Sequence, residues 1–380
     1  MRTAWAALAA TTVSFGLNFS AGVFFAPAAA SYGVSITALA MAAALSTALT
    51  GVVQPYVGTL LDRIGARRVL VIGLVLMSAS YLALATVTST WQFVAVYTVL
   101  GGLGFASSSS LTISTLIGRS YGTRAGPALT RAAIGINLGQ LLTPWAATAL
   151  FEPAGIRATY AILGAIGLVA TLVIAAVLPA DRPAAVGDGG MESLHGRGRI
   201  VASFGLHAAT MYVTVLILPK HATELGWSVT DAGLLVAVAA VAAGLTSAVL
   251  VRVLRTHPAD IPLRILHALR ALSMLLVFVA TDPVALIAGA VIFGLSSFPV
   301  IPLTMAVLSR GLDPARLGRT LAPAWVVHQL SAAAGLGVAA LIHLMADGYR
   351  TYFGLALLMS LTAIALLKER QHDLSTAQHR

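Results

Sequence analysis

The chain has 380 residues, of which 58% are hydrophobic and 9% are charged, and its mean hydropathy is +0.90. Soluble domains are about a quarter charged, so this composition excludes an ordinary water-soluble fold and favours a chain that is solvated by lipid. There is no cysteine, which excludes a disulfide framework, a thiolate metal site and a cysteine nucleophile. The net charge of +10 does not indicate nucleic acid binding, because the basic residues lie mainly in short loops between apolar runs.

Apolar segments recur along the whole chain, and each is long enough to cross about 30 Å of hydrocarbon as a helix. The predicted fold is an all-α membrane protein with twelve transmembrane helices. The first segment is similar to a signal peptide, but its removal would leave an odd number of spans, so we predict that it is the first helix. The predicted spans are 4–30, 36–60, 69–88, 91–117, 125–150 and 157–178 in the first half, and 200–220, 229–251, 262–281, 283–308, 318–345 and 350–368 in the second.

A stretch rich in glycine, proline and charge separates the two sets of spans. We predict an N-terminal six-helix bundle over 1–178, a flexible linker over 179–199, and a C-terminal six-helix bundle with a short tail over 200–380. One side of the predicted membrane has only Arg157, Lys220 and Arg350 in its loops. The positive-inside rule therefore predicts that both termini and the linker are cytoplasmic, in a multi-pass protein of the plasma membrane.

The two halves resemble each other at a nearly constant shift along the sequence. YGVSITAL at residues 32–39 matches LGWSVTDA at 225–232, and GLGFASSSSLT in span four matches GLSSFPVIPLT in span ten. GPAL at Gly126 matches GRTL at Gly318. Such a repeat predicts two pseudo-symmetric bundles related by an axis along the membrane normal, which rock about a substrate site near the midplane.

A charged motif, GTLLDRIGARR, occupies residues 58–68 between spans two and three. Gly58 and Gly65 allow close backbone approach and a tight turn, and the Asp62 carboxylate is favoured at the N-terminus of a neighbouring helix. A loop that only had to stay in the cytoplasm would need basic residues but neither this aspartate nor these glycines. We therefore predict that the motif is a latch for a gate.

This motif resembles the loop motif of the major facilitator superfamily, Gly-x-Leu-x-Asp-Arg-x-Gly-Arg-Arg/Lys. The resemblance implies that Asp62 contacts the start of span eleven, around residues 315–319. It also implies that the motif's arginines hold the loop inside the cell and pair with Asp62. The predicted gating residues are Gly58, Asp62, Arg63, Gly65, Arg67 and Arg68.

Within that superfamily, the chain resembles the bacterial monocarboxylate and oxalate/formate porter branch, through FSAGVFFAP in span one, YGVSITAL entering span two and GPALTRAAIGINLGQ in span five. The resemblance implies a secondary transporter of a small organic anion such as a monocarboxylate, by proton symport or anion exchange. Carboxylate-binding members of the branch use a Lys in span one and an Arg in span eight, and this chain has neither. Their absence favours the alternative, efflux of a neutral amphipathic compound.

Polar side chains on the faces of several predicted spans are candidates for substrate contact. Because no Asp or Glu lies mid-span, we do not expect a carboxylate proton relay. His207 is able to carry a proton or to pair with an anion. The alternative for these groups is hydrogen bonding across helices or to their own backbone, and for Arg131 it is snorkelling to the cytoplasm. The candidates are Asn18, His207, Asn137, Gln140, His328, Gln329, Ser14, Thr210 and Arg131.

Other classes of function are disfavoured by missing motifs. The chain has no HExxH or GxSxG motif, and no nucleotide-binding motif that would indicate ATP as the energy source. We expect a carrier rather than an enzyme, without cofactor or metal, that binds a small-molecule substrate and a coupled proton or counter-anion and acts as a monomer. A sensor built on a transporter scaffold remains as an alternative.

Overall fold

The computed structural model describes residues 2–34, 36–179, 194, 196–346 and 348–378. Throughout this part of the chain the regular structure is helical. Most of the predicted linker at 179–199 lies outside the described residues. The chain divides into two compact units: unit 1 is Met1–Glu192 with Ser309–Val326, and unit 2 is Ser193–Leu308 with Val327–Arg380. These bounds differ from the predicted domains in one respect, because residues 309–326 group with the first half.

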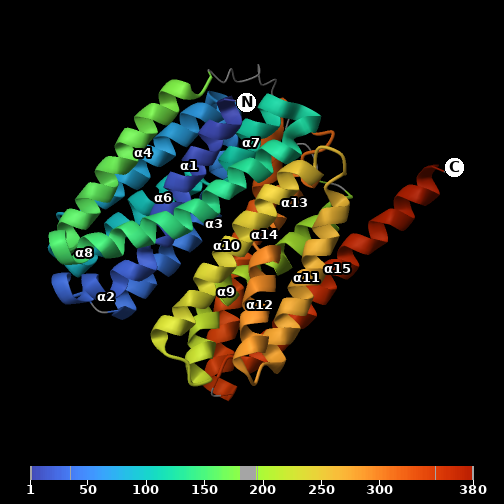
Figure 1. Cartoon of the computed structure of the whole chain (residues 1–380). Helices are drawn as coiled ribbons and strands as arrows, with labels where there is room; N and C mark the ends of the chain where they lie inside the picture. Colours follow the sequence, from blue (N-terminus) through green and yellow to red (C-terminus); the bar gives the residue numbers. More distant parts are fainter. Residues whose placement is uncertain (1, 35, 180–193, 195, 347, 379–380) are drawn as a thin grey trace. The chain divides into compact units, whose positions relative to one another are not determined.

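In unit 1, helices α1, α4, α6 and α8 pack side by side (Figure 1). The helical segments follow the first six predicted spans in order. They are α1 (Arg2–Phe19), α2 (Ala21–Tyr32), α3 (Ile36–Ile64), α4 (Ala66–Leu84), α5 (Thr90–Ala95), the π-helix η1 (Val96–Gly101), α6 (Gly102–Ser108), α7 (Ser110–Tyr121), the 3₁₀ turn η2 (Gly122–Arg124) and α8 (Ala125–Val177). The 3₁₀ turn η3 (Pro314–Arg316) and the start of α14 (Leu317–Ala346) also belong to unit 1.

In unit 2, α11 packs against both α12 and α15, and α9 packs against α10 and α15 (Figure 1). These segments follow predicted spans seven to twelve. They are α9 (Gly198–Glu224), α10 (Val229–Val253), α11 (Asp260–Val279), α12 (Pro283–Ser296), α13 (Val300–Leu308), the remainder of α14 and α15 (Arg350–Gln378). Helix α15 ends at Gln378, ten residues beyond the predicted end of the span at 368.

Several predicted spans are interrupted within their length. Span four breaks at Ser109, whose backbone is extended, and span ten breaks between α12 and α13. These two breaks fall within the two segments that match in the internal repeat. Spans five and six form one continuous assignment, α8, but Gly155 has φ 75° and ψ 167°, a conformation that only glycine adopts readily. The predicted boundary between the two spans is therefore present as a kink.

Apolar side chains cover the outer faces of the helices. On α10, Val241, Leu245 and Val249 follow each other at helical spacing and are 51%, 63% and 55% exposed. A row of exposed apolar side chains is unfavourable in water and favourable against lipid tails. By length and composition, 8 helical segments in the described residues are able to cross a membrane, and one of them, Thr90–Val177, covers three predicted spans.

Candidate functional site

The side chain of Asp62 is fully buried at the start of α14. Its Oδ1 accepts a hydrogen bond of 3.0 Å from the backbone N–H of Gly318, and its Oδ2 accepts one of 3.0 Å from that of Arg319. These N–H groups are in the first turn of the helix, where no backbone carbonyl is available to them. The carboxylate therefore caps α14 and interacts favourably with the positive end of its dipole. The predicted contact between Asp62 and residues 315–319 is confirmed.

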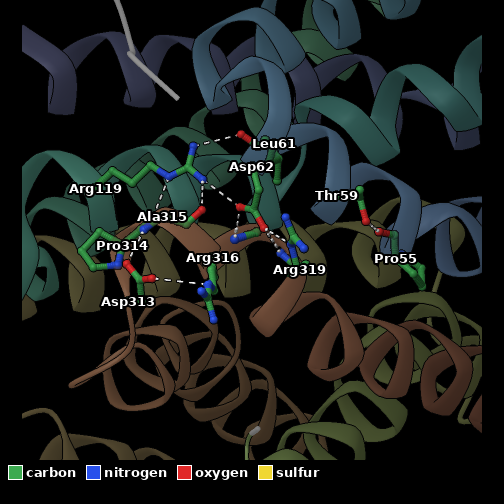
Figure 2. A network of polar contacts seen from close by, with 11 residues as sticks. Pro55, Thr59, Leu61, Asp62, Arg119, Asp313, Pro314, Ala315, Arg316 and Arg319 are labelled. Atoms are coloured by element: carbon green, nitrogen blue, oxygen red, sulfur yellow. Dashed lines mark hydrogen bonds and ion pairs between the residues drawn. The ribbon is translucent and has the colours of Figure 1, made fainter. Parts of the chain in front are cut away.

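Two arginines neutralise Asp62 (Figure 2). Nη2 of Arg119, at the end of α7, lies 2.7 Å from Oδ1, and Nε of Arg319 lies 3.0 Å from Oδ2. Arg119 also donates to the carbonyl oxygens of Leu61, Pro314 and Ala315, at 2.9, 2.8 and 3.1 Å. One guanidinium thus joins the end of α3 to the turn before α14. We call Asp62, Arg119, Arg319 and the first turn of α14 the Asp62 latch.

The partners predicted for Asp62 within the motif are wrong. Arg63 and Arg68 are exposed, and Nη2 of Arg67 donates to the carbonyl oxygen of Ala175 at the end of α8, at 2.7 Å. The ion-pair partners of Asp62 are instead Arg119 and Arg319, which are distant from it in sequence. Arg63 is adjacent to Asp62 in the last turn of α3 and lies on the exposed side of the helix, whereas Arg67 and Arg68 follow the turn at Gly65, which has φ 93°, and belong to α4.

Gly58 and Gly318 bring α3 and α14 together backbone against backbone. A Cβ on Gly318 would lie 2.5 Å from the carbonyl oxygen of Gly58 and 2.7 Å from Oδ1 of Asp62. A Cβ on Gly58 would lie 2.7 Å from the carbonyl oxygen of Gly318. Contacts this short do not occur between real atoms, so only glycine at both positions permits the capping geometry.

We expect Gly318→Ala to separate α14 from Asp62 and to lower the transport rate and the melting temperature of the purified protein. Gly337→Ala is the matched control, because Gly337 is in the same helix and its Cβ would meet nothing within 4 Å. Overpacking of this kind typically costs about 1–3 kcal/mol, which predicts a melting temperature several degrees below that of the control. Equal melting temperatures and transport rates in the two variants would contradict the close packing.

In unit 1, the predicted substrate residues do not form one cluster of hydrogen bonds. The Ser14 hydroxyl lies 2.7 Å from that of Ser108, across α1 and α6. Nδ2 of Asn137 donates to the Ala133 carbonyl oxygen one turn earlier at 3.3 Å, whereas its Oδ1 is buried without a partner among the described residues. Nε2 of Gln140 is likewise buried and unpaired, and Asn18 is half-buried. The two amides of α8 thus retain capacity for a ligand, and Ser14 does not depend on one.

Arg131 lies half-buried in α8, with its guanidinium carbon 5.3 Å from the ring centroid of Trp5 near the start of α1. A cation over an indole ring is favourable at this distance. The side chain therefore reaches toward the end of the bundle where α1 begins, which is the geometry expected of a snorkelling arginine.

In unit 2, predicted residues from α9 and α14 come together. The ring centroid of His207 lies 6.2 Å from that of His328 and 6.0 Å from that of His267, a residue of α11 that was not predicted. The Thr210 hydroxyl donates to the carbonyl oxygen of His207 at 2.9 Å, and Nδ1 of His328 lies 3.4 Å from Oε1 of Gln329. Among the described residues, no group of three or more His, Asp or Glu side chains is arranged to hold a metal ion.

Arg270 of α11 is the functional candidate absent from the predicted set. It is 1% exposed. Its Nε and Nη2 donate to the hydroxyl and the carbonyl oxygen of Ser296, at 3.2 and 2.8 Å, and its Nη1 donates to the Thr210 hydroxyl at 3.2 Å. Its guanidinium carbon lies 4.8 Å from the centroid of the Phe293 ring. No carboxylate of the described chain pairs with it, so a full positive charge is buried among neutral partners.

An uncompensated charge inside a membrane helix bundle costs several kcal/mol and is a mark of function. The sequence contains a signal for this site, because Arg270 lies inside the predicted span 262–281, three residues after His267 and thus on the same helix face. Span eight lacks the branch's arginine, but span nine contributes a buried arginine, so the absence from span eight alone does not favour a neutral substrate.

The helices that are able to cross a membrane and the buried cation of α11 agree with the class of protein that sequence comparison identifies. The sequence profile of the Major Facilitator Superfamily matches residues 7–204 and 199–379. The chain belongs to this superfamily and has its fold, twelve transmembrane helices in two six-helix halves, and it is a carrier rather than an enzyme. The two matches of one profile are what an internal repeat would produce.

The chain is similar over most of its length to proteins of known or assigned class. It is 25% identical over 376 residues to the uncharacterized MFS-type transporter YcxA of Bacillus subtilis, covering 92% of this chain and 90% of that protein. It is 31% identical over 324 residues to human monocarboxylate transporter 11, covering 80% of this chain and 68% of that protein. Among solved structures, the human organic anion transporter MFSD10 (TETRAN) superposes with a TM-score of 0.77 at 16% identity, covering 96% of this chain and 99% of that one.

Proposed function

We propose that the protein is a secondary active transporter that moves a small organic anion, such as a monocarboxylate, across the plasma membrane by alternating access. Its energy source is a coupled proton or exchange against a second anion. The observation that carries this proposal is Arg270, a fully buried cation to which the described chain offers no counter-charge. An anionic substrate supplies that counter-charge, and no carboxylate of the described residues competes with it for the guanidinium.

The names of two similar proteins agree with this substrate class. One relative is called a monocarboxylate transporter, and one structural neighbour is called an organic anion transporter. Asn137 and Gln140, with their unpaired amide atoms, and Asn18 remain candidates to contact the remainder of the substrate.

The Asp62 latch is the proposed cytoplasmic gate. Helix α14 belongs to unit 1 as far as Val326 and to unit 2 from Val327 onward. The latch holds the first turn of this helix. Alternating access requires the latch to form in one state and to open in the other. In this proposal both termini are cytoplasmic, and the protein acts as a monomer.

A ligand screen tests the substrate class. The melting temperature of the purified protein is measured with pyruvate, L-lactate and oxalate, and with neutral amphipathic drugs. A ligand that binds the folded state at about 100 times its dissociation constant stabilises that state by about 2.7 kcal/mol, so we expect at least one carboxylate to raise the melting temperature in wild type and not in Arg270→Gln. Stabilisation by the neutral drugs alone would favour efflux of an amphipathic compound and contradict the proposal.

A further inference from the structure

We propose that Arg270, Thr210 and His207 form one site in unit 2 that takes up an organic carboxylate first and a proton second, with the proton held on His207. This inference rests on the proposed anion transport, and it deepens that function by assigning the site and the order of binding. We call these three residues the Arg270 site.

The three residues are linked by direct contacts. The hydroxyl of Thr210 donates to the backbone carbonyl oxygen of His207 and accepts from Nη1 of Arg270, at 2.9 and 3.2 Å. His267 lies one helical turn before Arg270, and its ring is in T-shaped contact with that of His207 at 6.0 Å. Helices α9 and α11 thus bring a fixed cation and a titratable imidazole to the same part of unit 2.

Both groups have unused hydrogen-bonding capacity. A guanidinium has five N–H donors, and the contacts of Arg270 use three of them, so one N–H on each Nη atom is left. Two such donors suit the two oxygens of a carboxylate. Neither ring nitrogen of His207 has a hydrogen-bond partner in the described part of the chain, although the residue is only 2% exposed. Buried polar atoms are almost always paired in proteins, so these nitrogens indicate a ligand.

The charges around His207 determine when it can take up a proton. Helix α11 contributes His267 and Arg270, α14 contributes His328, and α15 contributes Tyr352, whose hydroxyl donates to the carbonyl oxygen of Ala209. The titratable residues of α10, Asp231 and Arg252, are in its first and last turns, and α12 and α13 have none. The only fixed charge among these near neighbours is therefore the positive charge of Arg270.

This arrangement sets the order of binding. Without substrate, protonation of His207 would place a second positive charge beside Arg270 in a site of low polarity, which is strongly unfavourable. A bound carboxylate cancels the charge of Arg270 and adds an acceptor for an imidazolium N–H. The proton then restores the net charge of the empty site, so the empty and the loaded site carry the same charge. Uptake of anion and proton is thereby coupled, and the coupling is reciprocal.

Proton uptake on binding tests this directly. Pyruvate is added to the purified full-length protein in weakly buffered detergent solution that contains a pH indicator, and bound pyruvate is measured in parallel. We expect the solution to become more alkaline, with up to about one proton taken up per pyruvate bound. Where one proton is linked, the dissociation constant for pyruvate rises by up to about tenfold for each unit of increasing pH.

Variants assign the proton to a residue. In His207→Gln we expect weaker pyruvate binding with no proton uptake. His257→Gln is the matched control, because His257 is an exposed histidine between α10 and α11, and it should behave like wild type. If His207→Gln fails to fold, the wild-type measurement still decides the coupling. Pyruvate binding without proton uptake by wild type would overturn this inference and leave anion transport standing. The absence of binding or transport of any of the three carboxylates would instead overturn the proposed function, and this inference with it.

Discussion

We expect Asp62→Asn to lower the transport rate by about tenfold or more while leaving expression and membrane insertion largely intact. The substitution preserves the shape of the side chain but removes the charge that Arg119 and Arg319 share. Removal of one partner from a buried ion pair costs about 3–5 kcal/mol. The arginines are 10% and 20% exposed, and this partial exposure reduces the expected cost to about 2 kcal/mol. A change of this size shifts the ratio of latched to unlatched molecules more than tenfold.

The measurement is the initial rate of pyruvate uptake into proteoliposomes that contain equal amounts of wild type and variant. Asp282→Asn is the matched control, because Asp282 also caps a helix, accepting from the N–H of Ala285 at 3.0 Å, but is exposed and has no arginine partner among its hydrogen bonds. Its loss should change the rate little. If Asp62→Asn transported pyruvate as fast as this control, the latch would be only a structural contact.

The second large effect is expected at Arg270. Arg270→Met should abolish pyruvate transport, with a loss of at least about 100-fold, because a bidentate charge-assisted contact to a carboxylate is lost. The same substitution should not lower the stability of the protein. Replacement of buried charges by apolar groups of similar volume is often neutral or stabilising by about 1–4 kcal/mol, so the melting temperature without ligand should stay equal to that of wild type or rise by a few degrees.

Two further variants make this result specific. Arg270→Lys keeps the charge but loses the planar fork, so we expect transport to persist with a raised KM. Arg264→Met removes a half-buried cation from the same helix, α11, and should not remove transport. A lower melting temperature together with normal transport in Arg270→Met would show that Arg270 is a packing residue that stabilises unit 2.

The Asp62 latch was predictable as far as local chemistry defines it. An aspartate between Gly58 and Gly65, in a loop that also contains arginines, indicates a carboxylate that caps a helix rather than a plain basic loop. Its ion-pair partners were not predictable in this way, because Arg119 and Arg319 lie far along the chain and are brought to Asp62 only by the packing of α7 and α14. Spacing within a motif does not contain that information.

Arg270 illustrates a different limit. The positive-inside rule depends on basic residues in the loops, and a cation in the middle of a span does not contribute to that pattern. Its position three residues after His267 does mark one face of a helix. Whether that face meets lipid or the histidines of α9 and α14 depends on the rotation of α11 about its axis. The polar residues Arg264, His267 and Arg270 recur every three residues on this otherwise apolar helix and indicate the face that turns away from lipid, but they do not identify the partners on α9 and α14.

Pyruvate counterflow is the most direct test of transport by alternating access at Arg270. Proteoliposomes are loaded with unlabelled pyruvate and diluted into a trace of labelled pyruvate. Wild type is predicted to accumulate label transiently above its equilibrium level, and Arg270→Met is predicted to show no such overshoot. An overshoot that persists in Arg270→Met, or its absence in wild type with each of pyruvate, L-lactate and oxalate, would contradict the account.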